Sequence, residues 1–399
     1  MMHSAPLTIG IEEEYQLIDP ATGELAAVVQ QLLHDDSIRQ IGDQVKPEFL
    51  QSQIEIGSAI CHNVQEARAE LVRLRREVNS VAERHGYGIM AASTHPFAKW
   101  EEQEANPGER YEDLKEYMQE VARQMLIFGM HVHVGFGTSR RQLDLLIDIQ
   151  NQLRYFLPHL LTFSTSSPFW HGHPTGLKSY RSIIFENLPR TGTAPIFSSF
   201  SEFERLIETF GQVGTLGKGR GDGKADYTKI WWDSRPHEDF GTLEIRICDI
   251  CTTVDEAVAV AALVQALVAK LIKLRNQNLS WRIYPNELIA ENKWRAVRWG
   301  LDGQLIDYGK REAVSMRDLA YELLEVVDDV VDELGSRDEV NYVRRILEKG
   351  TSSDRQLAVY KDCIANGATQ SEATKVVVDH LRAETLAGVR DDVGNALSC

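Results

Sequence analysis

Cysteine is scarce in this sequence, with five residues among 399, and their number is odd. So few thiols in so long a chain are typical of reduced cysteines in a cytoplasmic protein and argue against a disulfide framework. Basic residues are also in deficit, since 43 lysines and arginines face 59 aspartates and glutamates and leave a formal net charge of −16. This balance disfavours nucleic acid and anionic membranes as partners.

Long apolar runs and interdomain linkers are lacking as well. No apolar run approaches the length of a membrane span, and the first six residues contain no signal-peptide core. Because 43% of the residues are hydrophobic, the chain can bury a large core. We expect a single domain over residues 1–399, with a sheet and its flanking helices over residues 1–280 and a helical part over residues 281–399.

Alternating residues predict a strand near the N-terminus, over residues 9–17. Its apolar face would carry Ile9, Ile11, Tyr15 and Leu17. Glu12 and Glu14 share the other face with Gln16. Two like charges side by side on a strand repel each other, so a cationic side chain or a divalent metal must stabilise them, unless this is the solvated face of an edge strand.

Three further segments combine an apolar face with a polar one. The polar faces carry Gln51, Gln53 and Glu55 in residues 50–56, His131 and His133 in residues 129–136, and Glu244 and Arg246 in residues 241–249. Glu48 precedes the first of these segments with the wrong parity for its polar face. It can join the same site only if a bulge or bend lies between Glu48 and Gln51.

Helical periodicity dominates the rest of the chain. Helices are predicted over residues 64–85, 111–126, 140–160, 201–210 and 254–274, and over nearly all of the chain from residue 285. Residues 162–195 are rich in Ser, Thr, Gly and Pro and predict long loops. We expect an α+β fold in which the apolar face of an antiparallel sheet carries the helices. The other face would carry Glu12, Glu14, Gln53, Glu55, His131, His133, Glu244 and Arg246.

This polar face has the composition of a metal site. Carboxylates with one or two imidazoles and no cysteine favour Mg²⁺ or Mn²⁺. The His131–His133 pair alone also fits zinc, or two hydrogen-bonded structural histidines. An arginine beside metal ligands, such as Arg246, can neutralise a transferring phosphoryl group or bind a carboxylate. A metal-dependent hydrolase that uses the two histidines and a nucleotide-binding regulator without turnover stay open as alternatives.

Four motifs follow one another along the chain. They are Gly-Ile-Glu-Glu-Glu-Tyr at 10–15, Lys-Pro-Glu-Phe-Leu-Gln-Ser-Gln-Ile-Glu at 46–55, Met-His-Val-His-Val-Gly at 130–135 and Gly-Thr-Leu-Glu-Ile-Arg at 241–246. Together they resemble the type 2 glutamate–cysteine ligases, a family of ATP-dependent carboxylate–amine ligases distantly related to glutamine synthetase. The resemblance covers residues 7–275 and includes Ser166–Trp170 and Ser179–Arg181.

The resemblance implies a half-funnel antiparallel sheet, like the catalytic domain of glutamine synthetase, that holds ATP, Mg²⁺ and an amino acid. It implies one metal site formed by Glu12, His131 and Glu244, and another formed by Glu14, Glu48 and Glu55. Arg246 would face the γ-phosphate or the acyl phosphate, and His133 and Gln53 would also contact the cofactor. Arg181 and Arg235 would bind a substrate carboxylate, or are ordinary ion-pair arginines.

The reaction implied by the resemblance is amide formation. A carboxylate, glutamate in the family, attacks the γ-phosphate of ATP, and an amine such as cysteine attacks the resulting acyl phosphate, which gives a γ-glutamyl amide, ADP and phosphate. Activity with cysteine itself is expected to be weak. Partners would be small molecules, and a homo-oligomer is compatible with the sequence. The glycine-rich residues 213–229 form either a lid or a simple insertion.

Two other motifs are unconvincing. Residues 217–224 resemble a phosphate-binding loop, but Ala225 replaces the required Ser or Thr and no strand precedes them. Cys248 and Cys251 have the spacing of a redox pair at the start of a helix. Their position at a strand end also fits simple packing, which we favour.

Overall fold

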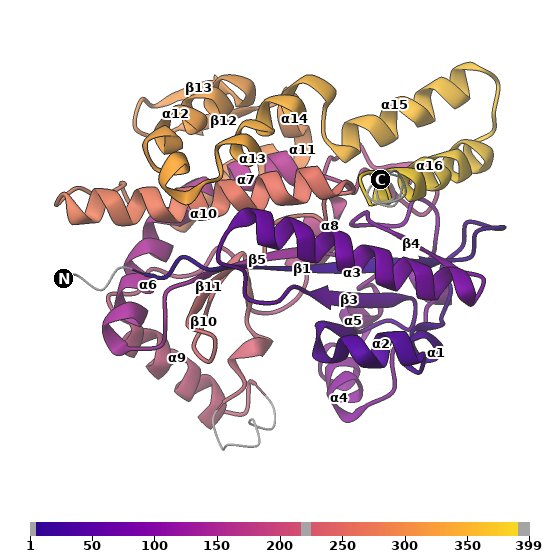
Figure 1. The fold of residues 1–399 in the computed structure, drawn as a ribbon, viewed down its shortest axis with the longest axis horizontal. Helices are drawn as coiled ribbons and strands as arrows, with labels where there is room; N and C mark the ends of the chain where they lie inside the picture. The colour runs from indigo at the N-terminus through magenta and orange to yellow at the C-terminus, as the bar shows by residue number, and fades with distance from the viewer. Residues whose placement is uncertain (1–4, 217–224, 390–399) are drawn as a thin grey trace, which may run out of the picture.

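The computed structural model describes residues 5–216 and 225–389, and a seven-stranded sheet lies at its centre (Figure 1). The strands lie in the order β10 (Ser234–His237), β11 (Thr242–Ile245), β5 (Met130–Gly135), β1 (Ile9–Ile18), β3 (Gln53–Gly57) and β2 (Val45–Pro47), and β4 (Gly88–Met90) also pairs with β1. Every pair in this sheet is antiparallel. The predicted α+β class and antiparallel sheet are confirmed.

The register of the sheet brings the polar residues of four strands together. On β1, Glu12 lies opposite His131 of β5, and Glu14 lies opposite Glu55 of β3. On the far side of β5, His133 lies opposite Glu244 of β11. Residues from four separate segments of the sequence therefore form one continuous polar surface.

Helices cover the apolar face of the sheet. The helix α3 (Val64–Arg84) packs against β1, and α10 (Val254–Asn276) packs against β5 and α3. Both begin as the sequence predicts: the Asn63 side chain accepts a hydrogen bond from the backbone of Glu66, and Thr253 forms a capping box with Glu256. The apolar side chains of these two helices and of the strands are buried against one another, and this burial stabilises the sheet. The helices lie on one side of the sheet and do not cover its polar face.

One feature of α10 was not expected. By length and composition this helix is apolar enough to cross a membrane, contrary to the expectation that no run approaches a membrane span. In the structure, 83% of its most apolar window is buried inside the protein. Its neighbours include α3, α6 (Arg140–Leu153), α7 (Leu157–Ser164), α12 (Met316–Leu334), α13 (Arg337–Asn341) and the sheet. Its apolar surface is therefore that of a central core helix.

Two predicted helices are interrupted. The helix expected over residues 111–126 is divided into α4 (Glu109–Met118) and α5 (Glu120–Arg123), because Gln119 adopts a positive φ of 51°. The helix expected over residues 140–160 consists of α6 (Arg140–Leu153), a 3₁₀ turn (Arg154–Phe156) and α7 (Leu157–Ser164). Ser139 and Gln142 form a capping box at the start of α6.

The region expected to be loops contains a helix, and the helical C-terminal part contains a hairpin. Residues 162–195 include α8 (Tyr180–Glu186) and the short strands β6 (Phe169–Trp170), β7 (His173–Pro174) and β8 (Thr191–Gly192), the last of which pairs with β9 (Trp231–Trp232). The helix α9 (Phe200–Gln212) matches its prediction. Beyond residue 285 a hairpin of β12 (Gln304–Asp307) and β13 (Glu312–Ser315) interrupts the helices.

The remaining helices complete the layer at the top of Figure 1 and the lower right corner of the sheet. They are α1 (Val29–Leu33) and α2 (Asp36–Ile41) beside β2 and α3, and α11 (Asn286–Trp299), α12 (Met316–Leu334), α13 (Arg337–Asn341), α14 (Val343–Lys349), α15 (Ser352–Ala365) and α16 (Gln370–Thr385). The largest buried apolar cluster includes side chains from both sides of residue 280. A single domain over residues 1–399 stays a prediction.

The segment that carries Glu48 is a hairpin. The sequence predicted one strand from residue 50, whereas β2 ends at Pro47, a turn occupies Gln51 and Ser52, and β3 begins at Gln53. Gln51 therefore leaves the polar face. The chain reverses between Glu48 and Gln53. The alternation of faces along β3 therefore does not determine which face Glu48 occupies, and the predicted bend is a complete turn.

Glu13 is a buried charge on the apolar side of β1 that the alternating pattern concealed. It is fully buried and forms an ion pair with Arg75 of α3, with Nη2–Oε1 and Nε–Oε2 separations of 2.5 and 2.9 Å. The hydroxyl of Tyr15 donates to the same carboxylate. A buried carboxylate requires such partners, because an unpaired charge in the core is strongly destabilising.

Candidate active site

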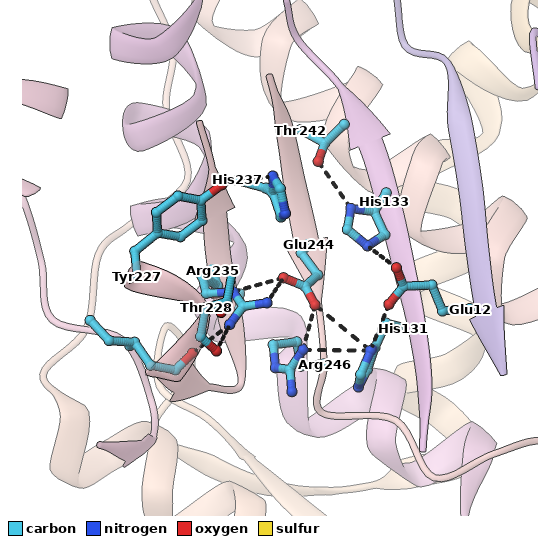
Figure 2. A network of polar contacts seen from close by, with 12 residues as sticks. Glu12, His131, His133, Tyr227, Thr228, Arg235, His237, Thr242, Glu244 and Arg246 are labelled. Carbon is cyan, nitrogen blue, oxygen red and sulfur yellow. Dashed lines mark hydrogen bonds and ion pairs between the residues drawn. The ribbon is translucent and has the colours of Figure 1, made fainter. Parts of the chain in front are cut away.

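The first cluster on the polar face consists of Glu12, His131 and Glu244 (Figure 2). The Nδ1 atom of His131 lies 3.0 Å from Oε2 of Glu12 and 3.7 Å from Oε1 of Glu244. One ligand atom from each residue lies within 4.8 Å of the other two, as a shared metal ion requires. The structure thus brings together the three residues predicted for one metal site.

The charges around this cluster keep both carboxylates ionised. Burial alone would raise the pKa of Glu12, but His133 and the hydrogen bonds from both histidines hold it well below its usual range. Burial likewise opposes ionisation of Glu244, but Arg235 and Arg246 hold its pKa well below normal. Burial, helped by Arg246, lowers the pKa of His131 to about 4, so its imidazole is neutral at neutral pH and offers a lone pair to a metal.

The two arginines beside Glu244 have different surroundings. Arg235 on β10 donates to Oε2 of Glu244 at 2.7 and 2.8 Å, and its Nη1 donates to the carbonyl oxygens of Thr228 and Ile230. Arg246 follows the end of β11 and donates through Nη1 to Glu244, while its buried Nε has no partner among the described residues. Arg246 therefore has free donor capacity beside the metal cluster, whereas Arg235 is occupied in orienting Glu244 (Figure 2).

His133 lies on the other side of Glu12 from His131 (Figure 2). Its Nδ1 forms a 3.0 Å hydrogen bond with Oγ1 of Thr242, and its Nε2 lies 3.4 Å from Oε1 of Glu12. Burial would lower the pKa of His133, but Glu12 raises it above its usual value. Protonation of His133 would compensate the charge of Glu12 and would make the imidazole a poor metal ligand in this arrangement.

The second cluster contains Glu14, Glu48 and Glu55. In the described residues, the ligand atoms of these three do not all lie within 4.8 Å of one another, in contrast to Glu12, His131 and Glu244. Within residues 5–216 and 225–389, no arginine or lysine forms an ion pair with any of these three carboxylates. Glu14 accepts hydrogen bonds from Nε2 of Gln53 at 3.0 Å and from the backbone N–H of Gly129 at 2.7 Å. The charges of Arg181, Arg110 and Lys46 act on the cluster without a direct ion pair.

Each of these carboxylates has a raised pKa. Burial and the charge of Glu48 raise the pKa of Glu14 to about 7. Burial raises the pKa of Glu55 well above normal, and the charges of Glu12, Glu48 and Glu14 add to the effect. Burial also raises the pKa of Glu48. Buried carboxylates that repel one another form an environment that a divalent cation would stabilise.

Arg181 lies beside Glu14 and has no carboxylate partner of its own in the described parts of the chain. Its Nη2 and Nη1 donate to the carbonyl oxygens of Arg246 and Ile247 at 3.2 and 3.4 Å. A Cβ atom on Gly129 would lie 2.7 Å from Arg181 Nη2, so only glycine leaves room for the guanidinium. The same glycine donates its N–H to Glu14, and it thereby positions the arginine and the carboxylate together.

Serines from the two segments included in the family resemblance, residues 166–170 and 179–181, hold the chain around Arg181 in place. The buried carboxylate of Asp249 accepts hydrogen bonds from the backbone N–H of Ser166 and the hydroxyls of Ser167 and Ser179, at 2.7 to 2.9 Å. The hydroxyl of Ser167 in turn accepts from the backbone N–H of Arg181. These residues act on the site through the position of Arg181.

A cavity of about 600 Å³ opens beside the second cluster. Its polar end is formed by Glu14, Glu48, Gln53, His131, Arg181 and Arg246. Its other walls come from α4, Met125, α8, the segment after α8 and Trp231, and are largely apolar or aromatic. No pattern in the chain predicted these walls, since they come from loops and helices that only the fold brings to the sheet. Residues 217–224 of the predicted lid lie outside the described residues, while Leu216 and Lys229 on either side line the cavity.

The cysteine pair has the environment of core residues. Cys248 and Cys251 are buried and carry free thiols. Burial raises the pKa of Cys248 to about 12 and that of Cys251 well above normal. Thiols this resistant to ionisation are poor nucleophiles, which supports the packing interpretation.

Comparison with known proteins now adds to this geometry. The model of glutamate-cysteine ligase family 2 matches residues 8–380. The chain belongs to this family. A protein of Herpetosiphon aurantiacus is 50% identical over 384 residues, which cover 96% of this chain and 94% of the relative, and one of Chloroflexus aurantiacus is 49% identical over 382 residues, which cover 96% and 93%. Both carry the name of a candidate glutamate–cysteine ligase 2.

Two solved structures of other proteins have the same fold as this chain, although their sequence identity to it is low. The glutamate–cysteine ligase of Francisella tularensis, solved in complex with AMP, superposes with a TM-score of 0.66 at 13% identity and covers 98% of this chain and 93% of its own. A bifunctional glutathione synthetase from Pasteurella multocida gives a TM-score of 0.66 at 13% identity, with 95% of this chain and 53% of the larger protein covered. These similarities confirm the fold that the motifs implied.

Proposed function

We propose that this protein is an ATP-dependent carboxylate–amine ligase that forms a γ-glutamyl amide through an acyl phosphate. The observation that carries this proposal is the Glu12–His131–Glu244 cluster on one sheet face, with the free donor of Arg246 beside it and a cavity lined by Glu14, Glu48 and Arg181. Family membership and the names of the relatives support the same chemistry.

The donor chemistry of both clusters suits Mg²⁺ or Mn²⁺, and the geometry of a shared ion is present for Glu12, His131 and Glu244. Their donors are carboxylate oxygens and one neutral imidazole, without thiolates, as these hard cations prefer. Glu12, His131 and Glu244 would hold one ion, and Glu14, Glu48 and Glu55 would hold another. Mg²⁺ and ATP together would supply an electrophilic phosphoryl group and neutralise its charge.

The residues of the chain would divide the remaining work. Arg246 would donate to the transferring phosphoryl oxygens through its free Nε. Arg181, at the polar end of the cavity, would hold the α-carboxylate of the glutamate-like substrate. Arg235 would be a positioning residue, because its contacts to Glu244 and two carbonyl groups occupy its guanidinium. His133 and Gln53 would orient Glu12 and Glu14 in addition to contacting the cofactor.

The hydrolase alternative is less compatible with the geometry. Such an enzyme would use His131 and His133 as a ligand pair, but the pKa of His133 is raised by Glu12, and its Nδ1 hydrogen-bonds to Thr242. Protonation of His133 removes the lone pair that a metal needs. The second carboxylate cluster would also have no role in that reaction.

The test is an ADP-release assay. ADP should appear only when Mg²⁺, ATP, an α-amino dicarboxylate such as glutamate and an amine are all present. Amide hydrolysis without nucleotide would instead support the hydrolase. ATP binding without ADP release, across a panel of carboxylates and amines, would support a regulator and contradict the ligase proposal.

A further inference from the structure

The cavity beside the second cluster would hold the glutamate-like substrate of the proposed function at its polar end, and its other walls are largely apolar and aromatic. Its volume of about 600 Å³ lies in the range typical of drug-sized ligands. Away from the carboxylates its walls include Leu114 and Met118 of α4, Leu188 after α8, and Trp231 of β9. Met118 and Leu188 are buried, so these walls are formed in the folded protein before any ligand binds.

Arg190 is a polar group set into this apolar wall. Its guanidinium lies over the rings of both Tyr117 and Trp231, with Cζ 5.5 and 5.3 Å from the ring centroids. Its Nε donates to the carbonyl oxygen of Lys229 at 3.0 Å, and its Nη1 lies 3.3 Å from the hydroxyl of Tyr117. In residues 5–216 and 225–389 it has no carboxylate partner, so its Nη2 side is available to a ligand.

The backbone also fixes Arg190 in place. Its φ of 60° is a conformation that side-chain-bearing residues rarely adopt. Such strain persists only where surrounding contacts determine the conformation, and here the ring stacking and the hydrogen bond to Lys229 do so. Three arginines without ion pairs in the described residues line the cavity, namely Arg181 at its polar end, Arg190 in its wall and Arg110 on α4, and hydrogen bonds hold Arg181 and Arg190 in place.

We propose that the amine substrate is an amino acid with a bulky apolar or aromatic side chain, whose carboxylate binds Arg190 and whose side chain packs against Leu114, Met118, Leu188 and Trp231. The inference rests on the proposed ligase function and names the acceptor that this function would use. Arg181 and Arg190 match the two carboxylates that stay unreacted when a glutamate-like donor is joined to an amino acid.

Physical complementarity favours this acceptor over cysteine. A cysteine side chain would bury little of the apolar wall, whereas a phenyl or isobutyl group gains free energy in proportion to the apolar area it removes from water. Asp113 and Glu116 also line the cavity, so a basic amino acid is the main competing acceptor. The amide bond itself forms in the same way in each case, with the loss of phosphate from the acyl phosphate.

The first experiment compares acceptors in the ADP-release assay at fixed glutamate, ATP and Mg²⁺. Phenylalanine and leucine should exceed cysteine, glycine and lysine in kcat/KM by about tenfold or more, the scale of discrimination that an apolar pocket provides. Phenethylamine, which lacks the carboxylate, should fall about tenfold below phenylalanine because it forfeits a charge-assisted hydrogen bond. Preference for cysteine or lysine would overturn the inference and leave the ligase proposal intact.

The second experiment uses variants of the wall. Leu114→Trp should fill the cavity and reduce kcat/KM for phenylalanine while that for glycine changes little, and Leu279→Trp, at a position 56% exposed and away from the cavity, is the matched control. Arg190→Gln should raise the KM for phenylalanine with little change in kcat, and it should leave the KM for phenethylamine unchanged. Arg190→Lys should partly restore the KM for phenylalanine. If Arg190 is merely structural, both acceptors will shift alike.

A third measurement does not depend on turnover. Calorimetric titration of phenylalanine into the protein without ATP should give binding to the wild type and to Leu279→Trp, and much weaker binding to Leu114→Trp and Arg190→Gln. If no amine supports ADP release while phenylalanine still binds in this pattern, the ligase proposal fails and the assignment of the cavity stands. If phenylalanine does not bind while ADP is released with other amines, the inference fails.

Discussion

Glu14 on β1 and Glu55 on β3 are directly opposite each other in the sheet, so two buried carboxylates meet across one strand pair. Such a pair is destabilising unless a cation lies between the groups or they take up protons. The structure shows hydrogen bonds to Glu14 from an amide side chain and a backbone N–H, both of which an amide in its place would largely preserve.

The first prediction is therefore that Glu14→Gln abolishes most ADP formation while leaving the metal-free protein at least as stable as the wild type. The substitution removes a proposed metal ligand and a repulsive charge but keeps an oxygen for the N–H of Gly129. Melting curves in chelator and then in Mg²⁺ with ATP would test this, since the ligands should raise the melting temperature of the wild type far more. A variant that melts far below the wild type in chelator, or turns over normally, would contradict the metal assignment.

The neighbouring residue provides the matched control and the second prediction. Glu13→Gln removes one charge from the same strand but on the opposite face, and it leaves Arg75 buried without its counterion. It should lower the free energy of unfolding by about 3–5 kcal/mol, with or without Mg²⁺. Chemical denaturation under both conditions measures this, and a destabilisation that Mg²⁺ reverses would mean that Glu13 belongs to the metal site.

The third prediction concerns pH. The pKa of Glu14 is about 7 in the folded protein against 4.5 as its ordinary value, so between these values the folded state binds more protons than the unfolded state. The contribution of this group to stability therefore falls as the pH rises through that window. In chelator, Glu14→Gln should match the wild type near pH 4.5 and become more stable by about 3 kcal/mol above pH 7.

The difference between the two proteins is the quantity to measure, by denaturation at each pH. The buried His95 and His159 have lowered pKa values and affect both proteins in the opposite direction, so their contribution cancels in the comparison. Saturating Mg²⁺ should abolish the difference or reverse its sign, because the cation stabilises the ionised wild-type site. A difference that does not vary with pH would show that Glu14 is ionised throughout the range.

The fourth prediction is that Cys251→Ser leaves ligation within a few-fold of the wild type. The thiol is buried and resistant to ionisation, and only the backbone carbonyl of Cys251 contacts a charged group, Arg75. The buried hydroxyl should lower the free energy of unfolding by about 1–3 kcal/mol. Activity assays before and after treatment with an oxidant give the decisive comparison, since an on/off response that the variant loses would indicate a redox role.

The sequence predicted the four central strands because each has one apolar face, and period-two alternation is a strong signal. It placed Glu12, His131 and Glu244 on one surface for the same reason. It did not show that Glu13 is a buried ion pair, because the partner, Arg75, is far away in the chain and its helix shows only amphipathic periodicity. A charge inside an apolar face is recognised only when its counterion is known.

Turns without glycine or proline were the other source of error. The chain reverses between Glu48 and Gln53 without either residue type, and Gln119 breaks a helical pattern with a positive φ. In both places tertiary contacts determine the backbone against weak local preferences. The cavity wall around Arg190 was missed for a related reason, since its residues are neighbours only after the sheet and α4 have packed together.

Arg75 joins parts of the protein that are distant in sequence. In addition to Glu13, its guanidinium donates to the carbonyl oxygens of Cys251, Thr252 and Thr385, the last residue of α16. The strand that presents Glu12 and Glu14 is thereby anchored to the C-terminal helix. An attempt to engineer a minimal ligase by trimming the gene after residue 280 would remove one of these acceptors, and we expect the shortened chain to lose its solubility before its chemistry can be assayed.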